Sequence, residues 1–222
     1  SANSINIGRL LPQATYYAWS SQRYFLKHGM QTSFIIPTGN LGNAFACFIA
    51  KEMGFPIENI VFATNANRTI PDFLETGFWQ PRPTIPTLAS AMDVGNPSNM
   101  ERFFHVFDNP ETLLDTLRAV SVTDEQITNQ IRSEYLDNQI LCCPHTATAL
   151  HVYREFSNKE KKETHWCIVA TAHPSKFEQT VEPIIGEEIA VPERLRALLE
   201  LDSSFVTIDP ELNQLIEAIA SV

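Results

Sequence analysis

The sequence predicts an α/β fold, with a mainly parallel sheet flanked by helices. Two short apolar runs, SFIIP at 33–37 and IVFATN at 60–65, are typical of strands that are buried on both faces, as the strands of parallel sheets are. A helical segment lies between them at 44–53. Strand, turn, helix and strand within about 30 residues form a βαβ unit, whose two strands run parallel with a right-handed crossover. This alternation indicates the α/β class.

The segments before and after this unit support the same class. Apolar residues at helical spacing predict a helix within 3–28, and Gly29 is a suitable end for it because glycine readily adopts the left-handed conformation. The stretch 66–98 is rich in proline and also carries aromatic residues. A flexible linker is less aromatic, so we expect an ordered functional loop region with short helical turns.

The second half is expected to be mostly helical. Thr123 and Gln126 have the spacing of a capping box at one helix start, and the charged stretch 157–165 is expected to be a solvated loop. WCIVATA at 166–172 predicts another buried strand. We expect a large domain at 1–185 and a helical tail at 186–222. The predicted helices are 98–107, 110–119, 123–137, 146–156, one beginning at Pro174, 192–201 and 209–220.

Composition limits the function. Among 222 residues 44% are apolar, the formal charge is −10, and no long basic run exists to bind a nucleic acid. No apolar stretch approaches the roughly 20 residues that cross a bilayer, and the first residues lack the pattern of a signal peptide. We expect a cytoplasmic protein. Its cysteines lack metal-type CxxC spacing and are expected to be reduced and mostly buried: Cys47, Cys142, Cys143 and Cys167.

The strongest local motif is PTGNLGN at 37–43, at the junction of a strand and a helix. Gly39 and Gly42 allow the backbone to approach a ligand closely, and the helix that follows begins with free amide donors and the positive end of its dipole. Together these features form a cradle for an anion such as phosphate. An ordinary βα turn that needs glycine only for its geometry is the alternative. The spacing is neither that of a Walker loop nor GxGxxG.

A second motif, TAHPSKF at 171–177, follows the predicted strand at 166–172. Ligand sites gather at the carboxyl ends of parallel strands, where the Thr171 hydroxyl could meet a heteroaromatic nitrogen. His173 could act as a general base, although a histidine before proline is more often a turn residue. Lys176 could form a Schiff base, but we expect it to point to solvent or to pack its aliphatic stem.

A third motif, SANSINIGR at 1–9, places small polar side chains before Arg9, whose planar guanidinium suits phosphate or carboxylate. The alternative is a capped helix start with an exposed arginine. Two further segments, 64–77 and 87–103, name no reaction by their chemistry alone. AMDVGNPSN within the latter is polar and rich in turns, and could line a cleft.

In combination these motifs resemble threonine synthase, a pyridoxal-phosphate enzyme of the tryptophan-synthase-β fold type, which is fold type II. The matching segments occur in a fixed order along nearly the whole chain: NSINIGR, PTGNLGN, GFPI with ATNANRTIPDFLETG, TLASAMDVGNPSNMERF, PHTATA and TAHPSKF. One glycine loop would be weak support, whereas six ordered segments are specific to the family. The family converts O-phospho-L-homoserine and water into L-threonine and phosphate.

The resemblance implies roles for individual residues. Thr171 would hydrogen-bond the pyridine nitrogen of pyridoxal phosphate as a neutral hydroxyl and so leave that nitrogen unprotonated. The cofactor phosphate would be bound by Gly39, Asn40, Leu41, Gly42 and Asn43. The substrate O-phosphohomoserine would be bound by Ser4, Asn6, Arg9, His145 and Thr146.

The sequence departs from the family at two points. None of its lysines lies in the phenylalanine-lysine-aspartate setting of the family's Schiff-base lysine, which belongs upstream of NSIN, so no catalytic residue and no metal ligand is assigned. We therefore expect a fragment without roughly the N-terminal half, inactive alone. Cys143 stands before PHTA, where the family often has an acidic residue. The alternative function is a non-catalytic module that binds phosphate or pyridoxal phosphate. No feature indicates the oligomeric state.

Overall fold

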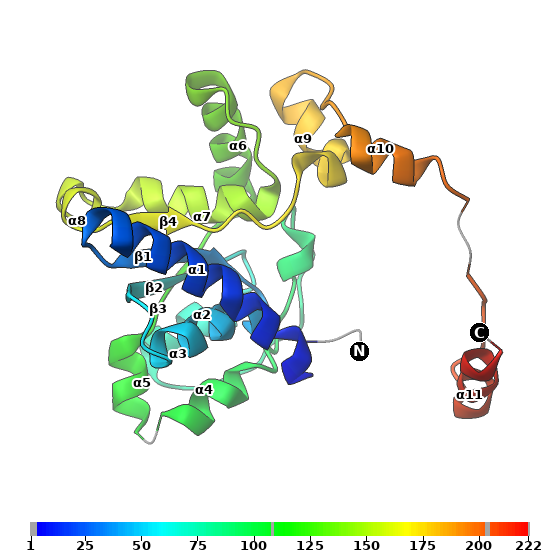
Figure 1. Ribbon diagram of the computed structural model, residues 1–222, viewed down its shortest axis with the longest axis horizontal. Coiled ribbons are helices and arrows are strands. Elements are labelled where there is room, and N and C mark those ends of the chain that lie inside the picture. The colour runs from blue at the N-terminus through cyan, green and yellow to red at the C-terminus, as the bar shows by residue number, and fades with distance from the viewer. Residues whose placement is uncertain (1–3, 108, 203–204, 222) are drawn as a thin grey trace. The chain divides into compact units, whose positions relative to one another are not determined.

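The computed structural model describes residues 4–107, 109–202 and 205–221. The chain divides into two compact units, 1–189 and 190–222. Within the described part of the first unit, four strands form a parallel sheet in the order β3-β2-β1-β4 (Figure 1). The strands are β1 (Thr32–Pro37), β2 (Ile57–Thr64), β3 (Arg118–Ser121) and β4 (Trp166–Ile168).

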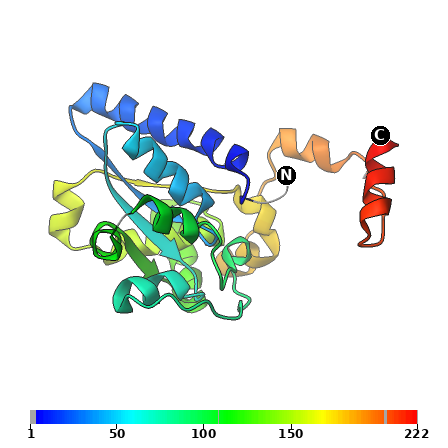
Figure 2. The same cartoon turned by 90° about the horizontal axis from the view of Figure 1, so that it is seen from below.

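Helices cover both faces of this sheet because side chains alternate along a strand. Phe34 and Ile36 of β1 pack into one apolar cluster with helices α1 (Leu11–His28) and α2 (Gly42–Glu52). Ile35, between them, packs into a second cluster with α6 (Asp124–Asn138) and α7 (Pro144–Glu155). Figure 2 shows α1 and α2 together on one side of the strands. The predicted parallel β1–α2–β2 unit and the α/β class are thus confirmed.

Several predicted helix boundaries are also confirmed. Gly29 ends α1 with a φ of 67°, and its N–H donates to the carbonyl of Phe25. Thr123 and Gln126 form the predicted capping box at the start of α6. The other elements of this unit are η1 (Ile7–Arg9), α3 (Thr69–Thr76), η2 (Ser90–Met92), α4 (Met100–Val106), α5 (Pro110–Thr116), α8 (Asn158–Glu163), η3 (Pro174–Phe177) and α9 (Glu178–Ile185).

Three sequence predictions are wrong. The helix predicted over 110–119 ends at Thr116, because residues from Arg118 onward pair with β2 as strand β3. The charged stretch 157–165 contains α8, which a capping box of Ser157 and Glu160 stabilises. The buried strand predicted over 166–172 has only three strand residues and is half-buried, since β4 is the last strand in the sheet order.

The second unit contains α10 (Glu193–Leu199) and α11 (Leu212–Ala220). Both lie within the segments for which helices were predicted, and α11 begins after Pro210. The boundary that we expected at 185/186 stays a prediction. Among the described residues, no helix has both the length and the apolar character needed to cross a membrane.

Candidate active site

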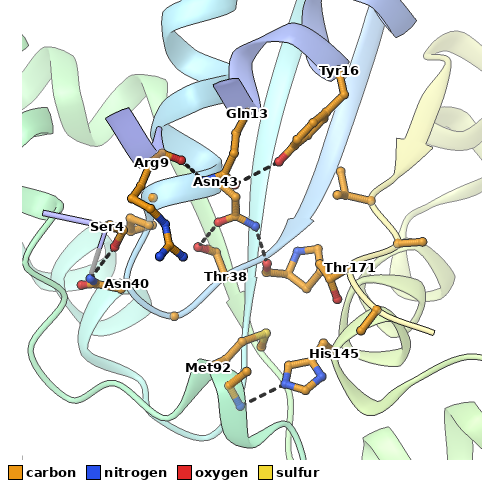
Figure 3. A pocket seen from close by; sticks show the side chains of 18 of the residues that line it. Ser4, Arg9, Gln13, Tyr16, Thr38, Asn40, Asn43, Met92, His145 and Thr171 are labelled. Atoms are coloured by element: carbon orange, nitrogen blue, oxygen red, sulfur yellow. Dashed lines mark hydrogen bonds between the residues drawn. The ribbon is translucent and has the colours of Figure 1, made fainter. Parts of the chain in front are cut away.

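A cavity of about 830 Å³ opens beyond the carboxyl ends of β1 and β4 (Figure 3). Four stretches of chain that are distant in sequence form its walls, and His145 of α7 adds a further side chain. Parallel strands place their carboxyl ends at one edge of the sheet, which is where open α/β folds bind ligands. The residues that these stretches contribute are Ser4, Arg9, Gln13 and Tyr16, the loop 37–43, Ala91 with Met92, and 169–172 with Lys176 and Phe177.

The loop after β1 is held by its own side chains. The Thr38 hydroxyl donates to Asn43 Oδ1 over 2.7 Å, and Asn43 Nδ2 donates to the Pro37 carbonyl over 2.9 Å (Figure 3). Leu41 adopts a left-handed conformation with a φ of 63° immediately before α2 begins. The first N–H groups of a helix have no acceptor within it, so the start of α2 presents free donors to the cavity.

Both glycines of this loop are required by close contacts. A Cβ on Gly39 would lie 2.7 Å from the Cα and carbonyl oxygen of Met92. A Cβ on Gly42 would lie 2.9 Å from Ser4 Cβ. The loop therefore fits between the backbone of η2 and the N-terminal segment only without side chains at these two positions.

The N-terminal segment supplies polar groups to the opposite wall. Ser4 and Arg9 line the cavity, and Asn40 Nδ2 donates to Ser4 Oγ over 2.9 Å. Asn6 lies outside this lining, because its side chain accepts the N–H of Gly8 and caps η1. Its assignment to the substrate stays a prediction. Residues 1–3 of the same motif lie outside the described residues.

Gln13 and Tyr16 also line the cavity, and the sequence motifs did not identify them. Gln13 Nε2 donates to the Arg9 carbonyl over 2.5 Å, and the Tyr16 hydroxyl donates to Gln13 Oε1 over 3.1 Å. Residues 9, 13 and 16 follow at spacings of four and three, which brings them to one face of a helix. That spacing is the signal that could have found them.

Thr171 lies on the cavity wall after β4, whereas Thr146 is buried behind it. The backbone N–H of Thr171 donates to Thr146 Oγ1 over 3.4 Å, so Thr146 supports this wall. Cys143 Sγ lies 3.3 Å from the Thr146 hydroxyl and 3.8 Å from the Thr171 hydroxyl. Thr146 therefore reaches the cavity only through the position of Thr171.

Cys143 caps the start of α7 and is buried. Burial alone would raise the pKa of its thiol, but the nearby imidazole of His145 and the hydroxyl and N–H of Thr146 outweigh burial and lower the pKa to about 6. A helix N-terminus stabilises a thiolate in the same way. The lowered pKa therefore favours the thiolate form of Cys143 near neutral pH.

His145 is only 3% exposed and lines the cavity. Its Nε2 accepts the N–H of Ala91 over 3.0 Å (Figure 3), so a neutral imidazole carries its proton on Nδ1. Nδ1 is buried and makes no hydrogen bond with the described residues. His145 therefore fixes η2 against α7, and its imidazole lies close enough to the Cys143 thiol to lower the pKa of that thiol.

The two other candidates of the TAHPSKF motif differ in position. His173 is a turn residue, since its Nδ1 accepts the N–H of Ser175 at the start of η3. Lys176 lines the cavity, and its side chain is exposed. Of the predicted ligand-binding residues the structure brings together Ser4, Arg9, residues 39–43, His145 and Thr171 around one cavity.

Comparison with known proteins gives two family matches. The family described as pyridoxal-phosphate dependent enzyme matches residues 15–172, and the family described as threonine synthase, C-terminal, matches residues 146–219. The chain is 37% identical over 217 residues to the threonine synthase of Buchnera aphidicola subsp. Schizaphis graminum, covering 98% of this chain and 50% of that protein. It is 36% identical over 201 residues to that of Escherichia coli, covering 90% and 46%.

Solved structures agree with these matches. Pyridoxal-phosphate-bound threonine synthase from Brucella melitensis superposes with a TM-score of 0.87 at 28% identity, over 99% of this chain and 52% of that chain. The threonine synthase from yeast superposes with a TM-score of 0.82 at 26% identity, over 98% and 52%. The chain thus spans about half the length of the relatives that it matches.

Proposed function

The chain belongs to the pyridoxal-phosphate-dependent enzyme family, and on that premise we propose that it is part of a threonine synthase. The proposed reaction converts O-phospho-L-homoserine and water into L-threonine and phosphate. Bound pyridoxal phosphate supplies the electron sink that makes the protons next to the amino group removable. The residues of this chain bind and orient the two phosphorylated molecules.

The fit of the cofactor phosphate is supported by the loop 39–43. Free N–H donors at the start of α2 and two glycines that admit no Cβ form a narrow cradle for an anion. Thr171 offers a neutral hydroxyl at the end of the neighbouring strand β4, which suits the pyridine nitrogen. We assign Gly39, Asn40, Leu41, Gly42, Asn43 and Thr171 to the cofactor.

The substrate phosphate is assigned to the wall that carries Ser4 and Arg9. The observation that carries the proposed function is that this wall and the loop 39–43 line the same cavity. The cavity therefore offers two sets of groups that suit an anion. Two such sets suit a phosphorylated cofactor and a phosphorylated substrate together. His145 and Thr146 complete the assignment, His145 by its place in the cavity lining and Thr146 by holding Thr171.

The positions of the lysines bear on whether this chain is active by itself. Within the described residues, Lys176 is the lysine that lines the cavity. Its place in η3 is unlike the phenylalanine-lysine-aspartate setting that the family uses. We expect the 222-residue chain to bind pyridoxal phosphate and to form no threonine by itself.

Calorimetric titration of pyridoxal phosphate into the chain tests this proposal, with Gly42→Asp as the disrupted variant. The added carboxylate meets Ser4 and repels an anion, so we expect binding to the unmodified chain and its loss in the variant. Equal binding to both would exclude the loop as the phosphate site. Threonine formed from phosphohomoserine by this chain alone would contradict the expected inactivity and would implicate Lys176.

A further inference from the structure

A network of hydrogen bonds behind the cavity wall determines whether the Ser4 hydroxyl donates or accepts hydrogen bonds. The Ser4 hydroxyl oxygen accepts hydrogen bonds from two side-chain amides, Asn40 Nδ2 at 2.9 Å and Asn99 Nδ2 at 3.0 Å. Asn99 is 1% exposed and is not among the residues that line the cavity. Any effect of Asn99 on a ligand there must therefore pass through Ser4 or Asn40.

The direction of both hydrogen bonds follows from groups that can only donate. Asn40 Oδ1 accepts the backbone N–H of Ser98 over 2.7 Å, so the other terminal atom of Asn40 is its nitrogen. Asn99 Oδ1 accepts Nε of the Arg102 guanidinium over 2.8 Å, which identifies its nitrogen in the same way. Both amide nitrogens therefore donate to Ser4 Oγ.

The Ser4 hydroxyl has two lone pairs and one proton, and both lone pairs are occupied by these amides. Its remaining capacity is to donate, and no acceptor for its proton occurs among the described residues. Because Ser4 lines the cavity, an anion there meets a hydroxyl that is already polarised as a donor.

We propose that Asn99 is a positioning residue that, with Asn40, fixes the Ser4 hydroxyl as a donor to a phosphate group in the cavity. The inference rests on the proposed use of this cavity for phosphorylated ligands. It extends that function by assigning a role to a buried side chain that touches no ligand. Arg102 holds the arrangement from behind, since its guanidinium also donates to the Ile5 carbonyl over 2.6 Å.

A double-mutant cycle with inorganic phosphate as the calorimetric probe tests the inference. We expect Ser4→Ala to weaken phosphate binding by about tenfold, because a hydrogen bond to a charged group is lost. Asn99→Leu should weaken binding severalfold in the unmodified chain and much less when Ser4 is already alanine, where only the second hydrogen bond of Asn99, to the Asn40 carbonyl at 2.9 Å, is lost. A purely structural role for Asn99 would give the same loss in both backgrounds.

Asn59→Leu is a matched control, because Asn59 Nδ2 likewise donates to a serine hydroxyl, that of Ser33, at 3.1 Å and away from the cavity. It should leave phosphate binding unchanged. If Asn99→Leu fails to fold, Asn99→Asp keeps the shape but cannot donate. Its loss of binding should persist in 1 M salt, where the Debye length is about 3 Å and the added charge is screened.

The outcomes separate this inference from the proposed function. Weakening by Ser4→Ala together with unchanged binding in Asn99→Leu, or additive losses in the cycle, overturns the role of Asn99 alone. Recovery of Asn99→Asp in high salt would do the same. Absence of phosphate binding by the unmodified chain, or binding that Ser4→Ala does not weaken, overturns the phosphate site and the inference with it.

Discussion

Gly39 lies where the loop after β1 meets the backbone of Met92, and its lack of a side chain allows this close approach. The glycine spacing of PTGNLGN predicted a close approach to a ligand, but the sequence could not identify Met92 as the backbone on its other side. In the same way Thr171 and Arg9 were identified from motifs, whereas Gln13 and Tyr16 were not, because polar residues on an exposed helix face are common without function.

Gly39→Ala is expected to disturb both stability and ligand binding. The new Cβ would lie 2.7 Å from backbone atoms of Met92, so loop or η2 must move, at a cost of about 1–3 kcal/mol. Pyridoxal phosphate should bind at least about tenfold more weakly, which a shift of 1.4 kcal/mol produces. Thermal unfolding and calorimetry measure the two effects.

Gly29→Ala is the control for that prediction. Gly29 has a φ of 67° but open space around its Cβ position, so alanine there strains the end of α1 without a clash. Stability should fall while ligand binding is kept. Normal pyridoxal phosphate affinity in Gly39→Ala would contradict the close fit between the loop and η2.

Cys143 gives the protein a pH-dependent stability. Its thiol has a pKa of about 6 in the folded protein against an ordinary value of 9.0, so between these values the unfolded chain binds the extra proton. Stability from this residue is complete above pH 9 and is lost as the pH falls towards 6, by up to about 1.4 kcal/mol per unit. The free energy of unfolding, measured with urea at several pH values in this range, should depend less steeply on pH in Cys143→Ser.

Cys142→Ser is the matched control, because burial raises the pKa of the Cys142 thiol to about 12 and it stays protonated throughout this range. The free energy of unfolding of Cys142→Ser should depend on pH as steeply as that of the unmodified chain. An unchanged slope in Cys143→Ser would show that another group causes the pH dependence.

Among the helices and strands, the sequence predicted those features that neighbouring residues determine. The capping box of α6 is a pattern of neighbouring residues, and it is present. β3 was missed because its four residues become a strand only by pairing with β2, from Val61 to Thr64. α8 was missed because its charges suggested a loop, although Ser157 and Glu160 carried a capping signal that could have identified it.

The contact between α6 and α7 depends on a buried carboxylate. Glu134 is 2% exposed and accepts two hydrogen bonds from Arg154, at 2.6 and 3.0 Å. Arg154→Met leaves that charge unpaired and should lower the free energy of unfolding by about 3 kcal/mol. Urea denaturation measures the loss.

The double variant Arg154→Met with Glu134→Leu removes both charges but leaves the buried Gln130 amide without its acceptor, so it should recover part of that stability. Losses that simply add would mean that the two residues contribute independently, and that the ion pair does not join the helices.

At the scale of the whole molecule, the net charge of −10 is compatible with the anion site that we propose, because local amides and side chains bind an anion and the total charge does not. The parallel sheet was predictable from apolar runs, and its carboxyl edge predicted where the ligand motifs would meet. The contribution of buried residues such as Asn99 was not predictable, since it depends on contacts between residues 4, 40 and 99 that only the fold brings together.

Backbone amide chemical shifts, measured by NMR during a titration with pyridoxal phosphate, report which N–H groups of the chain meet the phosphate and so test whether the loop 39–43 binds it. We expect the largest shifts at Gly39, Asn40, Leu41, Gly42 and Asn43, with a further shift at Thr171. Shifts confined to other parts of the chain, with the amides of this loop unmoved, would contradict it.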